Sequence, residues 1–275
     1  MAASLDQIVS ATRRRVSSAW TNARELEKRA REHTPRGFRR ALEKAAQGGV
    51  AVIAELKKAS PSRGVIRADF EPRQLAVELA EGGAAALSVL TDEEFFQGSL
   101  VHLRVASEAT RLPCLRKDFI VDELQLVEAL ANRADAVLLI VAALSPSELN
   151  SLAKRSRESG LDVLCEVHDQ AELKRALDAG CDLAGVNSRD LRTFKVDLNT
   201  TLRMGKVIPK NVLAVAESGI ESGSDIARLR AEGYRAFLIG ESLMKAPSPG
   251  NALRTLLNEV PGTRCPVPGT SRDAL

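Results

Sequence analysis

VAVIAELKKASPSRG, residues 50–64, starts as a continuous apolar run and ends in alternating charge. A short apolar run without polar alternation is typical of a strand that is buried on both faces. Alternate residues of a strand share a face, so Glu55 and Lys57 are expected to emerge side by side where this strand ends. The stretch therefore predicts a carboxylate and an ammonium at the end of a buried strand.

Further runs rich in Val, Leu, Ile and Ala repeat this pattern along the chain. With the first, the predicted strands cover residues 50–56, 86–91, 113–117, 135–141, 162–167, 182–187, 212–217 and 235–240. Strands of this kind that alternate with amphipathic helices form a parallel sheet. Eight repeats in a chain close to the ~250 residues typical of the fold favour a (β/α)8 TIM barrel. A doubly wound sheet is the weaker choice, because no G-x-G-x-x-G follows the first strand.

Helix signals are clearest in two of the intervening segments. Residues 145–160 open with a Ser cap and a Pro at the first helical position, and they end on a Gly. Residues 168–180 also end on a Gly, and their periodicity turns one apolar face toward the sheet. That face is expected to consist of Ala171, Leu173, Ala176 and Leu177.

Residues 1–49 precede the eightfold pattern and predict a helical extension, with helices at 5–20 and 38–47 that pack on one end of the barrel. Within it, the run Arg13–Arg15 is interpreted as a solvated helix face, with an anion-binding feature as the alternative. We expect residues 1–260 to form a single TIM-barrel domain. Residues 261–275 are rich in Pro, Gly, Ser and Thr and are expected to be a disordered tail.

Composition argues against several classes of function. The chain has 275 residues, 44% of them hydrophobic, and 39 basic against 36 acidic residues give a formal charge of only +3. With aromatic residues at 3%, this near balance argues against nucleic-acid binding. No apolar run reaches the ~18–20 residues of a membrane span, and the N-terminus lacks the apolar core of a signal peptide. We therefore expect a cytoplasmic protein that binds no membrane.

Cysteine and histidine positions favour reduced thiols and argue against a metal site. The cysteines show no C-x-x-C spacing and stand at Cys114, Cys165, Cys181 and Cys265. The first two fall in predicted strands, where a reduced thiol behaves as a small hydrophobic group. The histidines lie far apart, without clustered cysteines, at His33, His102 and His168. We therefore expect no zinc or haem site.

Charged and polar residues gather at the carboxyl ends of the predicted strands, where a barrel builds its active site. They are Glu55, Lys57, Lys117, Asp118, Glu166, Asn187, Arg189, Glu217 and Ser218. A buried ion-pair network that merely closes the barrel is the alternative, because desolvated ions need partners. The whole set favours chemistry, because apolar residues would close the barrel at a lower desolvation cost. Crowded lysines and carboxylates also shift each other's pKa values, as proton transfer near neutral pH requires.

Two glycine-containing strand ends predict a phosphate site. They are AESGI at residues 216–220 and FLIGES at residues 237–242. Barrels commonly hold a phosphate at these two strand ends with backbone N–H groups. The residues placed there are Ser218, Gly219, Gly240 and Glu241. Ordinary turn chemistry explains either glycine alone, whereas the pair on consecutive strands favours phosphate binding.

Taken together, these stretches resemble the indole-3-glycerol phosphate synthase family. The matching segments run from about residue 50 to residue 246 and include ELKKASPSRGVIRADFEP, SVLTDEEFFQGS, LRKDFIVDELQ, CEVH, GVNSRDLRTFKVDLNTT, AESGI and FLIGESLMK. The resemblance implies a phosphorylated small-molecule substrate, 1-(2-carboxyphenylamino)-1-deoxyribulose 5-phosphate, which loses carbon dioxide and water to give indole-3-glycerol phosphate. It implies no metal or organic cofactor, because the arylamine nitrogen itself supplies the electrons. Transient contact with other tryptophan-pathway enzymes is a further expectation.

The resemblance also implies catalytic roles. Lys117 corresponds to the general acid that protonates the carbonyl oxygen during ring closure, and Glu166 to the carboxylate that stabilises the iminium and shuttles protons. Glu55 and Lys57 correspond to the acid–base pair of the later dehydration. Asn187 corresponds to the residue that orients substrate hydroxyls. The alternative for Lys117 is a lysine that merely snorkels at the barrel rim.

The remaining matched positions imply substrate binding. Arg189 stands for the cation near the anthranilate carboxylate, where a guanidinium can bind two oxygens. Lys57 also reaches toward the phosphate. Other contacts to phosphate and substrate are expected from Ser60, Ser218, Gly219 and Gly240. The apolar slot for the aromatic ring is expected from Phe96, Phe119 and Leu138, and the alternative for these three is core packing. Some members carry Ser in place of Glu241, and we expect this carboxylate to turn outward, away from a dianionic phosphate.

Two other functions stay open at this point. One is a different phosphate-binding barrel, such as phosphoribosylanthranilate isomerase, which uses a Cys and an Asp. Cys114 lies in the third predicted strand rather than at the mouth of the first, which argues against that enzyme. The other is a non-catalytic barrel that binds a partner protein, against which the polar residues at five strand ends argue.

Overall fold

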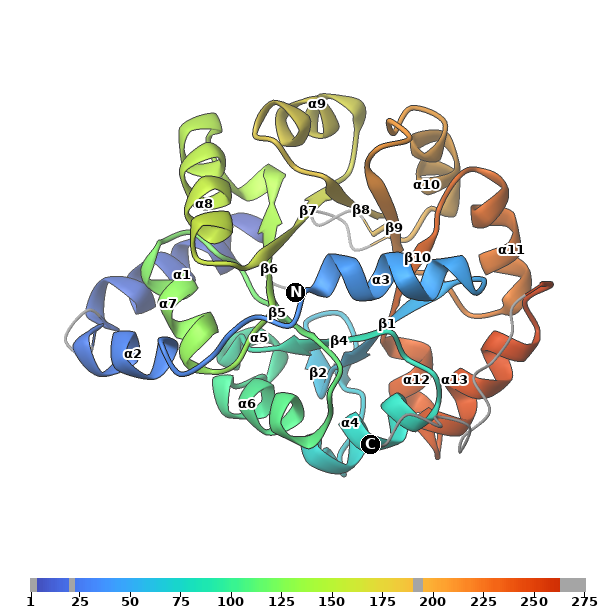
Figure 1. Ribbon diagram of the computed structural model, residues 1–275, viewed down its shortest axis with the longest axis horizontal. Helices are drawn as coiled ribbons and strands as arrows, with labels where there is room; N and C mark the ends of the chain where they lie inside the picture. Colours follow the sequence, from blue (N-terminus) through green and yellow to red (C-terminus); the bar gives the residue numbers. More distant parts are fainter. Residues whose placement is uncertain (1–3, 20–22, 190–194, 263–275) are drawn as a thin grey trace, which may run out of the picture.

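The parallel strands close into a barrel. The computed structural model describes residues 4–19, 23–189 and 195–262. Around the barrel the strand order is β1-β10-β9-β8-β7-β6-β5-β4 (Figure 1). The barrel strands are β1 (Ala51–Leu56), β4 (Ala86–Leu90), β5 (Cys114–Lys117), β6 (Ala136–Ile140), β7 (Asp162–Val167), β8 (Leu183–Asn187), β9 (Leu213–Glu217) and β10 (Ala236–Ile239). The predicted (β/α)8 TIM barrel is confirmed, and each strand lies within one or two residues of its predicted position.

Strand β1 closes the barrel by pairing with the last strand on one side and with β4 on the other. Ala51 is in register with Ala236 of β10, and Ile53 with Ala86 of β4. A short antiparallel hairpin follows β1 and was not predicted from the sequence; it consists of β2 (Ala59–Ser60) and β3 (Gly64–Val65). The chain therefore folds back over the barrel directly after the first strand.

Helices follow the strands and surround the barrel. They are α4 (Pro72–Glu81), α6 (Leu100–Ala109), α7 (Leu124–Ala131), α8 (Pro146–Glu158), α9 (Gln170–Asp178), α10 (Leu198–Gly205), α11 (Gly223–Ala231) and α13 (Pro249–Asn258). Shorter pieces are α5 (Glu93–Phe96), the 3-10 turn η2 (Val141–Ala143) and α12 (Glu241–Lys245). Ser145 caps α8 as predicted, in a reciprocal capping box with Glu148. On α9 the predicted apolar face is wrong at one position, because Ala171 is exposed.

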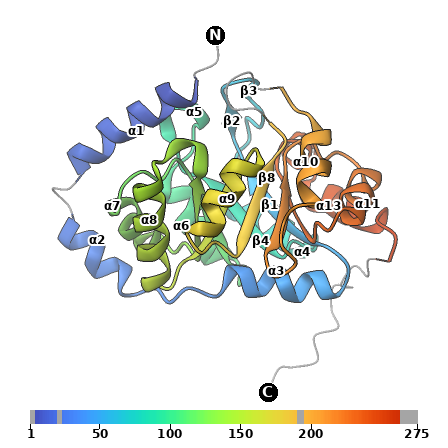
Figure 2. The same ribbon diagram turned by 90° about the horizontal axis from the view of Figure 1, so that it is seen from above.

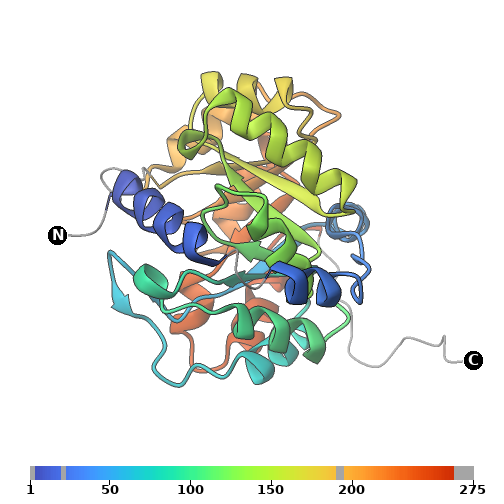
Figure 3. The same cartoon turned by 90° about the vertical axis from the view of Figure 1, so that its left-hand side faces the viewer.

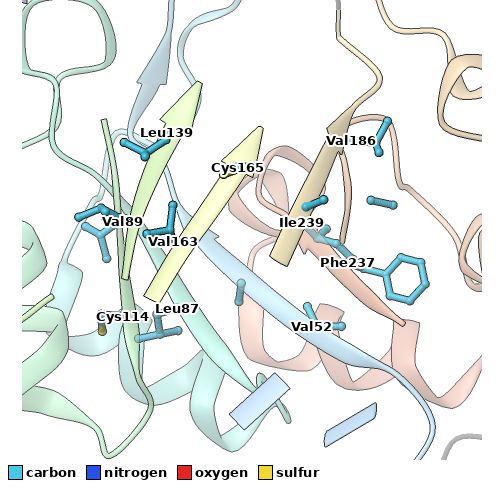
Figure 4. Packing of buried hydrophobic residues seen from close by; sticks show 14 of the residues in the cluster. Val52, Leu87, Val89, Cys114, Leu139, Val163, Cys165, Val186, Phe237 and Ile239 are labelled. Carbon is cyan, nitrogen blue, oxygen red and sulfur yellow. The ribbon is translucent and has the colours of Figure 1, made fainter. Parts of the chain in front are cut away.

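Alternation along the strands decides which side chains reach the barrel interior. The outward residues, such as Val52, Leu87 and Val163, pack against the surrounding helices (Figure 4). The inward residues begin with small and aliphatic side chains, such as Ala51 and Ile53 of β1. Because the side-chain period of a strand is two, the next inward position of β1 is Glu55. The barrel interior is therefore apolar in its lower layers and polar in the layer at the carboxyl ends of the strands.

The N-terminal extension contacts both ends of the barrel. It contains α1 (Leu5–Ala19), α2 (Ala23–Ala30) and α3 (Phe38–Gln47). Helix α3 crosses the amino end, where Phe38 and Leu42 are fully buried against the inward residues of the strands. Helix α1 lies on the opposite side, and its Ile8 belongs to the same apolar cluster as Phe119 after β5 (Figures 2 and 3). The expectation that the extension packs on one end is therefore wrong.

Two arginines of α1 form ion pairs with the barrel. Arg13 contacts Glu148 of α8 at 2.8 Å, and Arg15 contacts the buried Asp118 after β5 at 3.6 Å. Arg13 and Arg14 are exposed and Arg15 is half-buried, so the interpretation as a solvated helix face is confirmed at the first two positions and only in part at Arg15. The Arg15 pair connects α1 to the segment that follows strand β5.

The cysteines differ in part from the sequence expectation. Cys114 is a free, buried thiol, as expected. Cys165, expected to be reduced, is joined to Cys181 in a disulfide that links β7 to the segment before β8. No sequence spacing signalled this pair, because β7 and α9 bring the two residues together only in the fold. Cys265 lies outside the described residues, as does the predicted tail from residue 263 onward.

A search of the described helices for a membrane-spanning segment finds none that is long and apolar enough.

Candidate active site

One cavity of about 580 Å³ opens at the carboxyl ends of the strands. The structure brings all the site residues predicted from the sequence to its wall. They are Glu55, Lys57, Ser60, Phe96, Lys117, Phe119, Leu138, Glu166, Asn187, Arg189, Ser218, Gly219, Gly240 and Glu241. Residues that the sequence interpretation did not assign to the site also line it, among them Arg63 and Glu217. Strand parity explains part of this convergence, because Glu55, Lys117, Glu166 and Asn187 occupy the last inward position of their strands. Most of the other residues lie in the segments that follow the strands.

Glu55 and Lys57 lie side by side, as the opening stretch predicts. Lys57 Nζ donates a hydrogen bond to Glu55 Oε1 at 2.7 Å. The Glu55 side chain is only 5% exposed. It fits because Gly240 directly follows the neighbouring strand β10, and a Cβ there would lie 2.6 Å from Glu55 Oε1. The missing side chain at Gly240 therefore makes room for a buried carboxylate.

Lys117 lies between two buried carboxylates, Glu166 of β7 and Glu217 of β9. Its Nζ is 3.4 Å from Glu166 Oε2 and 3.9 Å from Glu217 Oε2. Both carboxylates are 1% exposed, whereas the Lys117 side chain is 15% exposed on the cavity side. A single ammonium thus serves two buried acids, so both acids cannot be fully compensated when ionised.

This shortage of positive charge separates the pKa values of the two acids. Burial alone would raise the pKa of Glu166, but Lys117 and then His168 hold it below its ordinary value. Burial, and next the charge of Glu166, raise the pKa of Glu217 to about 8. Burial opposes the charge of Lys117, yet Glu166, Glu217 and Glu55 together raise its pKa. Near neutral pH the site therefore holds an ionised Glu166, a protonated Glu217 and a charged Lys117.

Glu217 is the residue whose importance the sequence interpretation missed. It was recognised only as a polar strand end, without a role. Its position is the third inward position of β9, after Leu213 and Val215. A glycine on the next strand leaves the space for it, since a Cβ on Gly185 would lie 2.0 Å from Glu217 Oε1. Two features of the sequence could have identified Glu217: it occupies an inward-facing position of its strand, and the neighbouring strand has a glycine beside it.

A buried network behind β5 fixes the segment that carries Lys117. Arg116 points away from the cavity and contacts Asp118 and Glu128, each at 3.0 Å. Asp118 Oδ1 accepts from the Phe119 backbone N–H at 2.8 Å, and Gln125 donates to the Phe119 carbonyl at 3.0 Å. The residues on either side of Lys117 are therefore held by outward-facing partners, which limits how far its ammonium can move.

One side of the cavity is built from tight turns. Ser218 and Gly219 both have positive φ values, 68° and 72°, a conformation that is uncommon for a non-glycine residue. Ser188 Oγ stabilises this turn by donating to the Ser218 carbonyl at 2.8 Å. Ser60, on the hairpin after β1, has a buried Oγ without a hydrogen-bond partner among the described residues. A buried polar atom of this kind at a cavity wall is placed to contact a ligand.

Glu241 does not turn outward, so that expectation is wrong. Its carboxylate contacts Lys245 at 2.6 Å, Arg63 of the β2–β3 hairpin at 3.2 Å, and Arg189 at 3.4 Å. These cations come from three separate segments, and together they draw the carboxylate to the wall of the mouth. Its negative charge is thereby compensated by more than one positive charge.

Two aromatic side chains form an apolar wall in the same cavity. The rings of Phe96 and Phe119 have centroids 6.2 Å apart and are tilted by 37°, an arrangement typical of aromatic pairs. Leu138 of β6 belongs to the same apolar cluster. Among the described residues, no group of three or more His, Cys, Asp and Glu side chains is arranged to hold a metal ion.

The fold and the site define a TIM-barrel enzyme with lysine–carboxylate groups in an enclosed mouth. The family model described as "Indole-3-glycerol phosphate synthase" matches residues 5–256. The chain therefore belongs to the indole-3-glycerol phosphate synthase family. It catalyses the ring closure of 1-(2-carboxyphenylamino)-1-deoxyribulose 5-phosphate, with loss of carbon dioxide and water, and is thus a carboxy-lyase of tryptophan biosynthesis.

Individual relatives agree with the family assignment. The chain is 60% identical over 259 residues to an indole-3-glycerol phosphate synthase of Koribacter versatilis, covering 94% of this chain and 100% of that relative. It is 53% identical over 223 residues to one of Acidithiobacillus ferrooxidans, covering 81% and 85%. Among solved structures, a 3-hexulose-6-phosphate synthase matches with a TM-score of 0.62 at 14% identity, covering 76% and 99%. That last likeness concerns the fold alone.

Proposed function

We propose that Lys117 and Glu166 carry out the ring closure. Lys117 protonates the ketone oxygen as the aryl carbon attacks, and Glu166 stabilises the iminium that develops on the arylamine nitrogen. The observation that carries this assignment is the position of Lys117 Nζ, 3.4 Å from Glu166 Oε2 and open to the cavity. A charged donor beside an ionised acid is the arrangement that general acid–base catalysis requires.

Glu55 and Lys57 are assigned to the dehydration step. Their 2.7 Å hydrogen bond lets a proton pass between the two groups without rearrangement. Burial opposes ionisation of Glu55, but Lys57 and Lys117 hold its pKa below the ordinary value. Glu55 is therefore available as a base, and Lys57 as the acid that protonates the departing hydroxyl.

The binding residues surround these catalytic groups. Arg189 is assigned to the substrate carboxylate, Asn187 to the substrate hydroxyls, and Phe96, Phe119 and Leu138 to the aromatic ring. Ser60, Ser218, Gly219 and Gly240 are assigned to the phosphate and its neighbouring atoms, with Lys57 reaching toward it. Glu241 contributes by positioning Arg63 and Arg189 at the mouth. Incubation with the substrate, followed by indole fluorescence, tests the activity directly.

The raised pKa of Glu217 predicts the alkaline limb of the reaction. As pH rises through about 8, Glu217 loses its proton. The new charge strengthens the hold of the carboxylates on Lys117, which becomes a weaker acid, so kcat should fall. Glu217→Gln keeps a neutral side chain and should stay within about tenfold of wild-type kcat at pH 7, while losing this limb. A profile of kcat between pH 6 and 9.5 provides the measurement, and a limb that persists unchanged in the variant would refute the role of Glu217.

Glu241→Ser should change KM by less than tenfold, which is about 1.4 kcal/mol. The substitution removes a carboxylate that would repel the phosphate, but Lys245, Arg63 and Arg189 already compensate its charge. Steady-state kinetics at fixed ionic strength measure the change, with Glu158→Ser on the exposed face of α8 as control. A decrease of tenfold or more would mean that the Glu241 charge reaches the phosphate uncompensated.

Three broader expectations are also part of the proposal. Residues 1–260 act as one domain, which the extent of the family match, residues 5–256, supports. The protein works in the cytoplasm, where its biosynthetic substrate is made, and it contacts other tryptophan-pathway enzymes transiently. The biosynthetic role of the family supports both statements.

A further inference from the structure

His168 lies directly behind the catalytic carboxylate and has no assigned role. It follows strand β7, next to Val167, and its Nε2 is 3.8 Å from Glu166 Oε1. Lys117 approaches the other oxygen of the same carboxylate, Oε2. Glu166 is therefore placed between two basic groups, one on the cavity side and one behind. His168 itself is not among the described residues that line the cavity.

Helix α9 holds the imidazole in this position. His168 Nδ1 is 3.1 Å from Glu172 Oε2, and the same oxygen accepts from the His168 backbone N–H at 2.8 Å. The ring is thus fixed with Nε2 directed at Glu166. That nitrogen is buried without a hydrogen-bond partner among the described residues, and so is Glu217 Oε1, two strands away on β9. Two unsatisfied polar atoms beside one carboxylate leave a place for a proton, or for a bridging water.

The reaction itself creates a demand for protons. The substrate loses a carboxylate as carbon dioxide and a hydroxyl as water, so each turnover takes up one proton from the solvent. With the substrate in the mouth, Lys117 and Glu166 are covered on the cavity side. The His168 and Glu172 side chains remain 19% and 17% exposed, and neither is among the described residues that line the cavity. They are therefore placed to connect the buried acids with solvent away from the cavity.

We propose that His168, anchored by Glu172, is a positioning residue that keeps Glu166 ionised and returns protons to the Glu166–Glu217 pair. This inference rests on the proposed roles of Glu166 and Lys117. In each transfer the imidazolium gives its Nε2 proton to the carboxylate pair and keeps the Nδ1 proton that faces Glu172. Nε2 then takes one proton back from the solvent through a bridging water. One proton moves and no electrons do.

The charges around His168 agree with this role. Burial opposes a charged imidazole, but Glu172 of α9, Glu166 of β7 and Glu217 of β9 raise the pKa of His168. The imidazolium in turn lowers the pKa of Glu166, together with Lys117 of β5. Removing His168 should therefore raise the pKa of Glu166 and move the acid limb of kcat to higher pH.

The test compares the kcat–pH profiles of wild type, His168→Gln and His102→Gln. His102 packs on Phe70, away from the cavity, and serves as the matched control. His168→Gln should lower kcat about tenfold at pH 7, leave KM within about twofold, and move the acid limb up by about half a pH unit or more. His102→Gln should change none of these. A lower kcat with an unmoved acid limb, or a profile equal to wild type, would overturn the proposal.

A second variant gives a readout that does not depend on turnover. The chain has only three histidines, so the two substitutions assign the His168 imidazole signal in NMR spectra. Its pKa should lie above 6.5 in wild type and fall in Glu172→Gln, and Glu172→Gln should move the acid limb in the same direction as His168→Gln. An unchanged His168 titration in Glu172→Gln contradicts the anchoring role. Absence of indole formation by the wild-type protein would instead refute the proposed function, so the two failures are distinguishable.

Discussion

Lys117→Met is expected to lower kcat by about 10² or more, roughly 2.7 kcal/mol in barrier height, with a much smaller change in KM. Methionine keeps most of the length of the side chain and removes its ammonium group. The loss should appear in kcat because the protonation of the ketone occurs only in the transition state. Indole fluorescence under saturating substrate measures the effect, and Lys154→Met on exposed α8 provides the control.

A charge-preserving variant separates chemistry from folding at this position. Loss of the Lys117 ammonium leaves Glu166 and Glu217 without compensation, which destabilises a buried cluster. Lys117→Arg retains the positive charge, but a guanidinium gives up its proton too reluctantly to act as a general acid. It should fold with a cooperative thermal transition and still lose about 10² in kcat. Normal indole formation by either variant would refute the role of Lys117.

Glu166→Gln is the second substitution expected to have a large effect, again about 10² or more in kcat. The amide matches the shape of the carboxylate but cannot accept a proton or stabilise an iminium by charge. Lys117 also loses the partner that contributes most to raising its pKa. The acid limb of the kcat–pH profile should therefore disappear rather than move, which distinguishes this variant from the ones at His168.

A matched control for this substitution is Glu158→Gln at the exposed end of α8. Its kinetics should equal those of wild type, since the carboxylate is half exposed and is not among the described residues that line the cavity. If Glu166→Gln kept both the wild-type kcat and the acid limb, the role of Glu166 would be refuted. The acid limb would then report the titration of another carboxylate.

The barrel could be predicted from the sequence because its strands are buried on both faces. Such strands are short continuous apolar runs, and the glycines and caps between them mark the ends of the helices. The extension was harder to place. Helix α2 is rich in charge and carries no apolar run, and the contact of α1 with the mouth depends on Arg15 reaching Asp118. Neither feature has a local signal.

Four residues of the candidate site could be predicted from parity, since Glu55, Lys117, Glu166 and Asn187 occupy the last inward position of a barrel strand, which faces the mouth. What the sequence did not reveal depends on contacts between distant segments. The pKa of Glu217 is set by burial and by Glu166, and its space is provided by Gly185. The direction of Glu241 is set by Arg63 and Arg189, which are remote from it along the chain. Proximity of this kind becomes visible only in three dimensions.

The pairing of β1 with β10 has a consequence for how the chain folds. The first barrel strand finds one of its two partners only after the last strand has been made, so closure joins segments from opposite ends of the barrel sequence. Contacts of such long range make folding slow, because the loop entropy is lost before the contacts form. Until closure, β1 and β9 are open parallel edges rich in apolar residues, which favour association with other chains. Refolding yield should therefore fall as protein concentration rises.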